Sequence, residues 1–351
     1  MLDLDMRTSD IVAKAIPHAG SLREALDLYT EMKLKETLNY AVANSKFYRE
    51  KYEDIDKPFS ELPFTTEEEL RERGMDMLCV SPSQISRIVT SGTTGTPKRV
   101  YFTAEDQQLT IDYFNHGMRL IVDSSDKVLI LMPARVAGSI GLLLGQGLRD
   151  LGAEAVEYGL PDFSGAAGDK QVKELIELIK EEGITSIVGL PTHLIRIARE
   201  AGDEITLRSI LLSAEYVPAK TMMLLEETFG CCVFEHYGMT EMGLGCAVSC
   251  GYGRGYHVRE ADLYIELINP RTGELVTGEG RQEGFSNYGE IVFTTLTRKG
   301  MPFIRYRTGD FSRWVLQPCP CGSVLKRLDK VVPREAEITK AEAMKNSEGT
   351  E

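Results

Sequence analysis

Between residues 126 and 237, short apolar runs alternate with amphipathic segments. The apolar runs of strand length are Lys127–Met132, Ala155–Tyr158, Ser186–Leu190, Ser209–Leu212 and Cys232–Phe234. The segments between them have helical spacing and are Ile140–Leu151, Lys170–Glu181, His193–Ala201 and Ala219–Phe229. Strand–helix alternation with nearly continuous apolar strands is typical of a parallel sheet that helices cover on both faces. The predicted fold class is therefore α/β.

The pattern changes on both sides of this core. Residues 1–80 are largely helical in period, and near Pro63 either Thr65 or Thr66 is expected to cap a helix with an acidic first turn. After residue 255 the helical period disappears, and β-rich runs predict an appended antiparallel region with strands at Asp262–Asn269, Gly289–Leu296 and Phe311–Leu316. We expect one large unit over residues 1–326, divided into a helical lead-in (1–80), an α/β core (81–254) and a β-rich part (255–326). Residues 327–351 form a hinge-like segment and a charged tail.

Charge and cysteine content narrow the classes of function. The chain of 351 residues has a formal net charge of −13, which repels phosphate backbones and argues against a nucleic-acid partner. No apolar run approaches the ~20 residues needed to cross a bilayer, and no secretory signal is visible at the start, so no membrane partner is expected. Seven cysteines are an odd number for a disulfide scaffold and indicate reduced thiols in a cytoplasm, some of which hold a metal.

A loop rich in glycine and hydroxyl groups is the most informative motif. Its residues are Ser91, Gly92, Thr93, Thr94, Gly95, Thr96, Pro97 and Lys98. Backbone amides and hydroxyls of such a loop can surround an oligophosphate, and Lys98 adds a cation. The glycine spacing differs from a Walker A loop, and the loop joins two predicted strands, Ile85–Val89 and Arg99–Phe102, before a helix capped by Thr103. The alternative is a flexible surface loop.

Three further segments follow in order. They are Ser213-Ala214-Glu215, Tyr237-Gly238-Met239-Thr240-Glu241 and Arg307-Thr308-Gly309-Asp310. Together with the loop they resemble the motifs of the adenylate-forming enzymes, which include acyl- and aryl-CoA ligases, peptide-synthetase adenylation domains and luciferases. With Leu62–Thr66 and Cys319–Gly322, the variants here are most similar to phenylacetate–CoA ligases. The resemblance covers nearly the whole chain and implies the large N-terminal domain of that family.

The resemblance implies a role for each matched residue. Such enzymes join a carboxylate to the α-phosphate of ATP, release pyrophosphate, and usually pass the acyl group to coenzyme A. Residues implied in nucleotide binding are Ser91–Thr96, Lys98, Ser213, Ala214, Glu215, Tyr237, Gly238, Asp310 and Arg327. Tyr237 would cover the adenine, Asp310 would accept hydrogen bonds from both ribose hydroxyls, and Arg327 would contact ribose or phosphate. The catalytic set is Glu241 as the Mg²⁺ ligand, Thr240 on the α-phosphate and His236 on the acid carboxylate.

Plain structural roles remain open for several of these residues. Tyr237 alternatively plugs the end of the sheet, and His236 alternatively is a hydrogen-bonded core histidine. Without the resemblance, Glu215 is an exposed loop acid and Asp310 belongs to a Gly-Asp turn. For the acid pocket the resemblance points to Gly189–His193 and, more weakly, to Phe114, Ala137 and Gly138.

A second set of side chains has the chemistry of a metal site. Cys250, His257, Cys319 and Cys321 offer three thiols and an imidazole, the ligands that tetrahedral zinc prefers. Some relatives of the phenylacetate–CoA ligase branch carry a zinc at this place, so a structural Zn²⁺ is expected. Cys246 is an alternative to Cys250, and the opposing reading is a group of free thiols.

The chain departs from the family at its end. Only 21 residues follow Lys330, too few for the small mobile domain that carries the family's catalytic lysine. The chain is either a truncated piece or a naturally single-domain member. We expect ATP- and Mg²⁺-dependent activation of an organic, aryl acid with transfer to coenzyme A. The alternatives are a nucleotide- or acyl-adenylate-binding protein with little turnover, and an enzyme that feeds an amine or a carrier-protein thiol. A homodimer, or a partner that supplies the missing domain, is left open.

Overall fold

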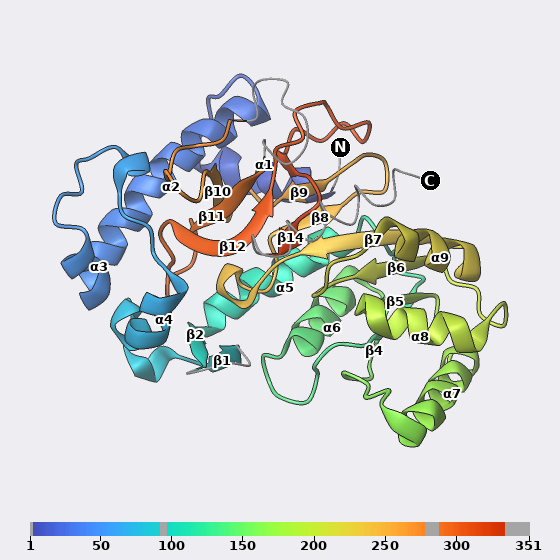
Figure 1. Cartoon of the computed structure of the whole chain (residues 1–351). Helices are drawn as coiled ribbons and strands as arrows, with labels where there is room; N and C mark the ends of the chain where they lie inside the picture. Colours follow the sequence, from blue (N-terminus) through green and yellow to red (C-terminus); the bar gives the residue numbers. More distant parts are fainter. Residues whose placement is uncertain (1–2, 92–96, 278–287, 334–351) are drawn as a thin grey trace.

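The computed structural model describes residues 3–91, 97–277 and 288–333, and Figure 1 shows how its elements are arranged. Within these residues the larger sheet has eight strands in the order β13-β9-β8-β7-β6-β5-β3-β4. The strands are β3 (Lys127–Ile130), β4 (Glu154–Glu157), β5 (Ser186–Gly189), β6 (Ser209–Leu212), β7 (Cys232–Tyr237), β8 (Ala247–Ser249), β9 (Tyr256–Val258) and β13 (Arg327–Leu328). Neighbours from β4 to β7 pair in parallel, whereas β7, β8, β9 and β13 pair antiparallel. The predicted α/β fold with a parallel core is confirmed.

Helices cover both faces of this sheet because its strands are apolar on both sides. One face packs on α5 (Ala104–Met118) and α6 (Ile140–Leu151), with Leu148 and Ile130 in the same buried cluster. The other face packs on α7 (Gly165–Glu181), α8 (Pro191–Ala201) and α9 (Ala219–Phe229), with Ile176 and Ile187 in the same buried cluster. The predicted α6 and α9 have the observed bounds, and α7 and α8 begin a few residues earlier than expected.

The lead-in is helical, as its period predicts. It contains α1 (Asp3–Ala15), α2 (Leu22–Asn44), α3 (Lys46–Lys51) and α4 (Glu67–Arg73), with short 3₁₀ turns at Phe59–Glu61, Gly74–Met77 and Pro82–Gln84. Ser45 separates α2 from α3, since its extended backbone ends one helix while its side chain caps the next. Thr66, not Thr65, caps α4 and forms a capping box with Glu69. None of the helices in the described part of the chain combines the length and the apolarity that spanning a bilayer requires.

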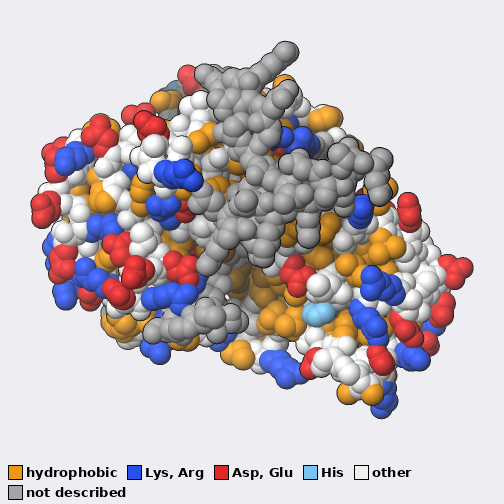
Figure 2. Space-filling view, viewed as in Figure 1, with side chains coloured by type: hydrophobic (Ala, Val, Ile, Leu, Met, Phe, Trp, Pro, Cys, Tyr) orange, Lys and Arg blue, Asp and Glu red, His pale blue; other side chains and the backbone are white. Residues whose placement is uncertain are grey.

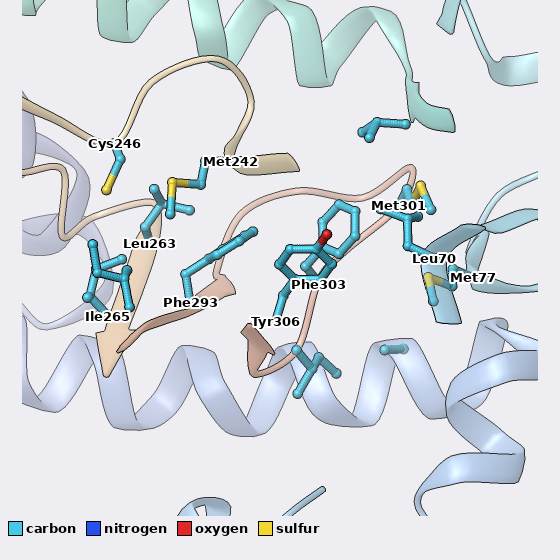
Figure 3. Packing of buried hydrophobic residues seen from close by; sticks show 14 of the residues in the cluster. Leu70, Met77, Met242, Cys246, Leu263, Ile265, Phe293, Met301, Phe303 and Tyr306 are labelled. Carbon is cyan, nitrogen blue, oxygen red and sulfur yellow. The ribbon is translucent and has the colours of Figure 1, made fainter. Parts of the chain in front are cut away.

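A second, antiparallel sheet follows the α/β core. Its order is β10-β11-β12-β14, with β10 (Leu263–Ile268), β11 (Gly289–Thr295), β12 (Tyr306–Ser312) and β14 (Val332–Pro333). Figure 3 shows the rings of Phe293, Phe303 and Tyr306 gathered over the long helix beneath this sheet. The antiparallel region is therefore confirmed, but the strand predicted at Phe311–Leu316 is wrong in its position. Pairing with β11 places the strand at β12, because the pairing is interrupted by a bulge at Thr308-Gly309-Asp310, which looks like a turn in the sequence, and resumes at Phe311.

The glycine-rich loop joins the two strands of a small hairpin. β1 (Arg87–Ser91) pairs antiparallel with β2 (Lys98–Phe102), and the register places Ser91 opposite Lys98. The predicted strand–loop–strand arrangement is confirmed at both ends, whereas Gly92–Thr96 lie outside the described residues. Thr103 and Asp106 form the expected capping box at the start of α5.

Candidate active site

A polar cavity opens at the carboxyl ends of β6 and β7, where open α/β sheets bind ligands. It has a volume of about 620 Å³ including its mouth, and we call it the strand-end cavity. Its walls are Ala214, Glu215, Tyr216, Val217, Glu235, His236, Tyr237, Gly238, Tyr256, Asp310, Lys330 and Val331. Two predicted segments, at the ends of β6 and β7, thus meet Asp310 of β12 from the other sheet. Figure 2 shows hydrophobic atoms exposed in the hollow near the centre of one face of the molecule, with charged side chains spread around its rims.

Tyr237 and Asp310 are directly linked across this cavity. The Tyr237 hydroxyl donates a hydrogen bond of 3.0 Å to Asp310 Oδ2. Burial, followed by the nearby Asp310 charge, raises the pKa of Tyr237 well above its ordinary value, so the phenol stays protonated and remains a donor. Asp310 is therefore held as a hydrogen-bond acceptor in the cavity wall, which suits a ligand that offers hydroxyl donors.

His236 belongs to two cavities at once. Besides the strand-end cavity, it lines an apolar cavity of about 430 Å³ including its mouth, with Tyr113, Phe114, Gly117, Met118, Met132, Ile140, Leu144, Val188, Leu211, Ser213 and Val248. His236 Nδ1 shares a hydrogen bond of 3.2 Å with Ser213 Oγ, and its Nε2 is buried without a partner among the described residues. Burial, with the positive charge of Arg259, lowers the pKa of His236 to about 4. At neutral pH the ring is an uncharged hydrogen-bonding group between a polar and an apolar space.

Glu241 is held by three segments that are distant in the chain. It lies in the 3₁₀ turn Thr240–Met242 after β7 and is 1% exposed. Lys98 Nζ of β2 is 2.7 Å from Glu241 Oε1, and the hydroxyl of Tyr306 donates to the same oxygen at 3.4 Å. The buried Arg298 donates to the Glu241 carbonyl at 2.9 Å and so fixes the backbone of the turn. The predicted phosphate-loop lysine and the predicted metal ligand are thus in direct contact.

The predicted Cys–His set comes together from two loops and one strand, β9. The ligand atoms of Cys250, His257, Cys319 and Cys321 all lie within 4.8 Å of one another. Cys250 Sγ is 3.6 Å from Cys319 Sγ, and Cys321 Sγ is 3.4 Å from His257 Nε2. Burial, with the charge of Arg327, lowers the pKa of His257 to about 4, which leaves a neutral imidazole able to bind a metal. This donor set fits tetrahedral zinc, and Cys246, the alternative to Cys250, is not part of it.

Comparison with known proteins decides the family. The model of the AMP-binding enzymes matches residues 49–295, which is most of the chain. The chain belongs to the AMP-binding enzyme family. Its curated relatives include the phenylacetate–coenzyme A ligases of Escherichia coli strain K12 (29% identical, covering 91% of this chain and 73% of the relative) and Thermus thermophilus (28%, 89% and 71%). The resemblance inferred from the motifs, including the ligase branch, is therefore confirmed.

Solved structures show the same fold for this AMP-binding enzyme. An open conformation of 2-hydroxyisobutyryl-CoA ligase, in complex with 2-HIB-AMP and CoA, aligns with a TM-score of 0.74 at 22% identity. The alignment covers 89% of this chain and 70% of that ligase. The prediction of an enzyme like the acid–CoA ligases is confirmed by the curated relatives.

Not every residue predicted for the site lies in the strand-end cavity of this AMP-binding enzyme. Arg327 of β13 donates to the carbonyl oxygens of Arg254 (2.6 Å) and Gln317, beside the Cys–His set, and is not in the cavity wall. Glu215 does line the cavity, where the amide and hydroxyl of Thr192 donate to its carboxylate at 3.2 and 3.1 Å. Phe114 lines the apolar cavity, whereas Ala137 and Gly138 are not among its lining residues.

The structure also adds residues that the motifs did not indicate. Glu235 and Lys330 form an ion pair in the cavity wall, and Lys330 Nζ lies 5.4 Å from the centre of the Tyr216 ring. Tyr306 and Glu67 contact the Lys98–Glu241 pair. Of these residues, only Glu235 could have been inferred from the sequence. It is two residues before Tyr237, and residues two apart in a strand lie on the same face.

Proposed function

We propose that this protein activates an apolar, aryl-type carboxylic acid as its acyl-adenylate, using ATP and Mg²⁺, and passes the acyl group to coenzyme A. The observation that carries the proposal is His236, which lines both the polar strand-end cavity and the apolar cavity. A reaction between a carboxylate and a nucleotide phosphate needs two such compartments that meet at one point. The phenylacetate–CoA ligases among the relatives join an aryl acid to coenzyme A by name, and the acid proposed here is of that type.

In the strand-end cavity, we assign the nucleotide to the residues that the motifs indicate. Asp310 would accept hydrogen bonds from the ribose hydroxyls, and Tyr237 would cover the adenine while its hydroxyl keeps Asp310 in place. Ser213–Glu215 would form the adenine wall. Gly92–Thr96, which lie outside the described residues, would surround the phosphates together with Ser91, Lys98 and Thr240.

The acid would lie in the apolar cavity with its carboxylate toward His236. Val188, Leu211 and Phe114 line this cavity and favour a ring or branched hydrocarbon over a polar chain. A neutral His236, oriented by Ser213, can donate one hydrogen bond to a carboxylate oxygen without holding it as an ion pair. The carboxylate would then remain free to attack the α-phosphate.

Glu241 fits the magnesium that this chemistry requires. Its carboxylate is buried, belongs to the segment that leaves β7, and already has a cation, Lys98, at 2.7 Å. Mg²⁺ held there would neutralise phosphate charge. We therefore assign the metal to Glu241.

ATP–pyrophosphate exchange over a panel of acids tests the proposal. We expect exchange with arylacetates or benzoates to exceed exchange with short hydrophilic acids, and Glu241→Gln to abolish it. Offering coenzyme A, an amine or a carrier protein to the same assay identifies the acceptor. ATP binding without exchange for any acid would contradict the enzymatic proposal and favour a nucleotide-binding protein.

The Cys–His set is proposed to hold one structural zinc ion. It lies where β9, the loop after β8 and the segment before β13 meet, so a bound ion would fasten these segments together. Purified protein should contain about one zinc per chain. Cys319→Ser should lower both the zinc content and the melting temperature. Less than about half an equivalent of zinc in folded protein would rule the site out.

A further inference from the structure

The ammonium group of Lys98 lies between two carboxylates that come from distant parts of the chain. Lys98 Nζ is 2.7 Å from Glu241 Oε1 and 3.6 Å from Glu67 Oε1. The side chains of Lys98 and Glu241 are 11% and 2% exposed, so water solvates neither charge well. Lys98 opens β2 directly after the glycine-rich loop, whereas Glu67 is the first residue of α4. These three charged side chains thus connect the start of β2, the start of α4 and the turn after β7.

The two carboxylates differ in whether they keep another ion-pair partner when Lys98 moves away. Glu67 also forms an ion pair with Arg71, one turn further along α4, so it keeps a cation of its own. Among the residues that the structure describes, Lys98 is the only cation within ion-pair distance of the Glu241 carboxylate. Tyr306 adds a hydrogen bond to that carboxylate but no charge. Removing Lys98 therefore leaves the buried Glu241 carboxylate without an ion-pair partner among the described residues, which is costly. The buried Arg298, which is bonded to the Glu241 carbonyl oxygen, then remains as a nearby positive charge.

We propose that Lys98 is the resident cation of Glu241 in the nucleotide-free protein, and that it prevents a divalent metal from binding there until ATP arrives. The proposal rests on the function proposed above, in which Glu241 holds the metal and Lys98 contacts phosphate. A metal alone must enter beside an ammonium group of the same sign. A nucleotide alone must draw Lys98 away from a buried carboxylate. When both arrive, Lys98 turns to the phosphates and the metal takes its place, so every charge keeps a partner.

Mn²⁺ binding to the nucleotide-free protein tests this inference without any turnover. The readout is the electron paramagnetic resonance signal of free Mn²⁺, a good substitute for Mg²⁺ at oxygen ligands. Wild-type protein should bind Mn²⁺ weakly. Lys98→Met should bind it at least tenfold more tightly, because the competing cation is gone. Combining Lys98→Met with Glu241→Gln should remove the gain, because the carboxylate is then neutral.

Lys51→Met is the matched control, since Lys51 forms its ion pair with Glu69 of α4 and none with Glu241, and it should leave Mn²⁺ binding unchanged. Lys98→Gln is a second variant in case Lys98→Met folds poorly, and it should show the same gain. Folded Lys98 variants that bind Mn²⁺ no better than wild type would overturn the inference, as would tight Mn²⁺ binding by the wild-type protein. Failure of the wild-type protein to bind ATP is measured separately, because the Mn²⁺ experiment contains no nucleotide. That result would refute the proposed function and leave the Mn²⁺ result to be judged by itself.

Discussion

The buried imidazole of His236 predicts a specific loss of stability in acid. Its pKa is about 4 in the folded protein, against 6.5 for an ordinary histidine, chiefly because burial disfavours the charged form. The unfolded chain therefore takes up a proton at a higher pH than the folded one. Acid stabilises the unfolded state, so the contribution of His236 is fully present above about pH 6.5 and is lost as the pH falls toward 4.

The size of this effect follows from the two pKa values. For a single group with these values, linkage gives a free energy of unfolding about 2 kcal/mol lower at pH 5 than at pH 7.5. His257 has a similarly lowered pKa and adds its own pH dependence. That contribution is common to the wild-type protein and a His236 variant, so it cancels when the two are compared.

Urea denaturation of wild-type protein and of His236→Gln, each at pH 7.5 and pH 5, measures the difference. Glutamine does not titrate, so the variant should lose about 2 kcal/mol less than wild type between these pH values, whatever its stability at pH 7.5. His18→Gln, at an exposed position of the lead-in, should behave like wild type. An equal pH dependence for wild type and His236→Gln would show that His236 is not held neutral by burial, and the role given to it here would fail.

Further predictions concern the two cavities and the buried charges. Asp310→Ala should weaken AMP binding at least about tenfold in calorimetry, since hydrogen bonds to a charged group are lost, and Tyr237→Phe should cost less because its ring remains. Val188→Phe should fill the apolar cavity and raise KM for an aryl acid at least about tenfold, while the Kd for ATP stays unchanged. Arg305→Met should lower the free energy of unfolding by about 3–5 kcal/mol in urea, because it leaves Glu266, whose side chain is 1% exposed, without its ion-pair partner at 3.0 Å. Wild-type behaviour in any of these assays would contradict the corresponding assignment.

Local sequence pattern was sufficient for much of the fold. The runs at Ser209–Leu212, Ile140–Leu151 and Ala219–Phe229 have the observed bounds, because an apolar strand or an amphipathic helix carries its own period. The short strands β8 and β9 were not predicted. Each has three residues, too few for a period to show, and they form through pairing with β7 and with each other.

The site was predictable in chemistry but not in all its contacts. The motifs indicated Tyr237, Asp310 and Glu241, and the structure brings the first two within a hydrogen bond of each other and places Glu241 in the turn after β7. Arg327 is different. Its charge and its place before Asp329 suited a nucleotide contact, yet pairing of β13 with β9 turns its guanidinium toward backbone carbonyls beside the Cys–His set.

Glu67 shows why the remaining contacts could not be inferred from the sequence. It is the first of three consecutive glutamates, and all three equally suit the positive end of a helix. The capping box uses Glu69, which leaves two candidates with the same chemistry. Only the packing of α4 against β2 brings Glu67 to Lys98, through a contact between residues 31 positions apart. A motif records which chemical groups a site requires, whereas the choice among equivalent neighbours depends on a tertiary contact that has no local pattern. The same reasoning applies to Lys98 and Glu241. Both belong to motifs, but only the structure shows that their charged groups lie 2.7 Å apart, and the proposed control of metal binding depends on that contact.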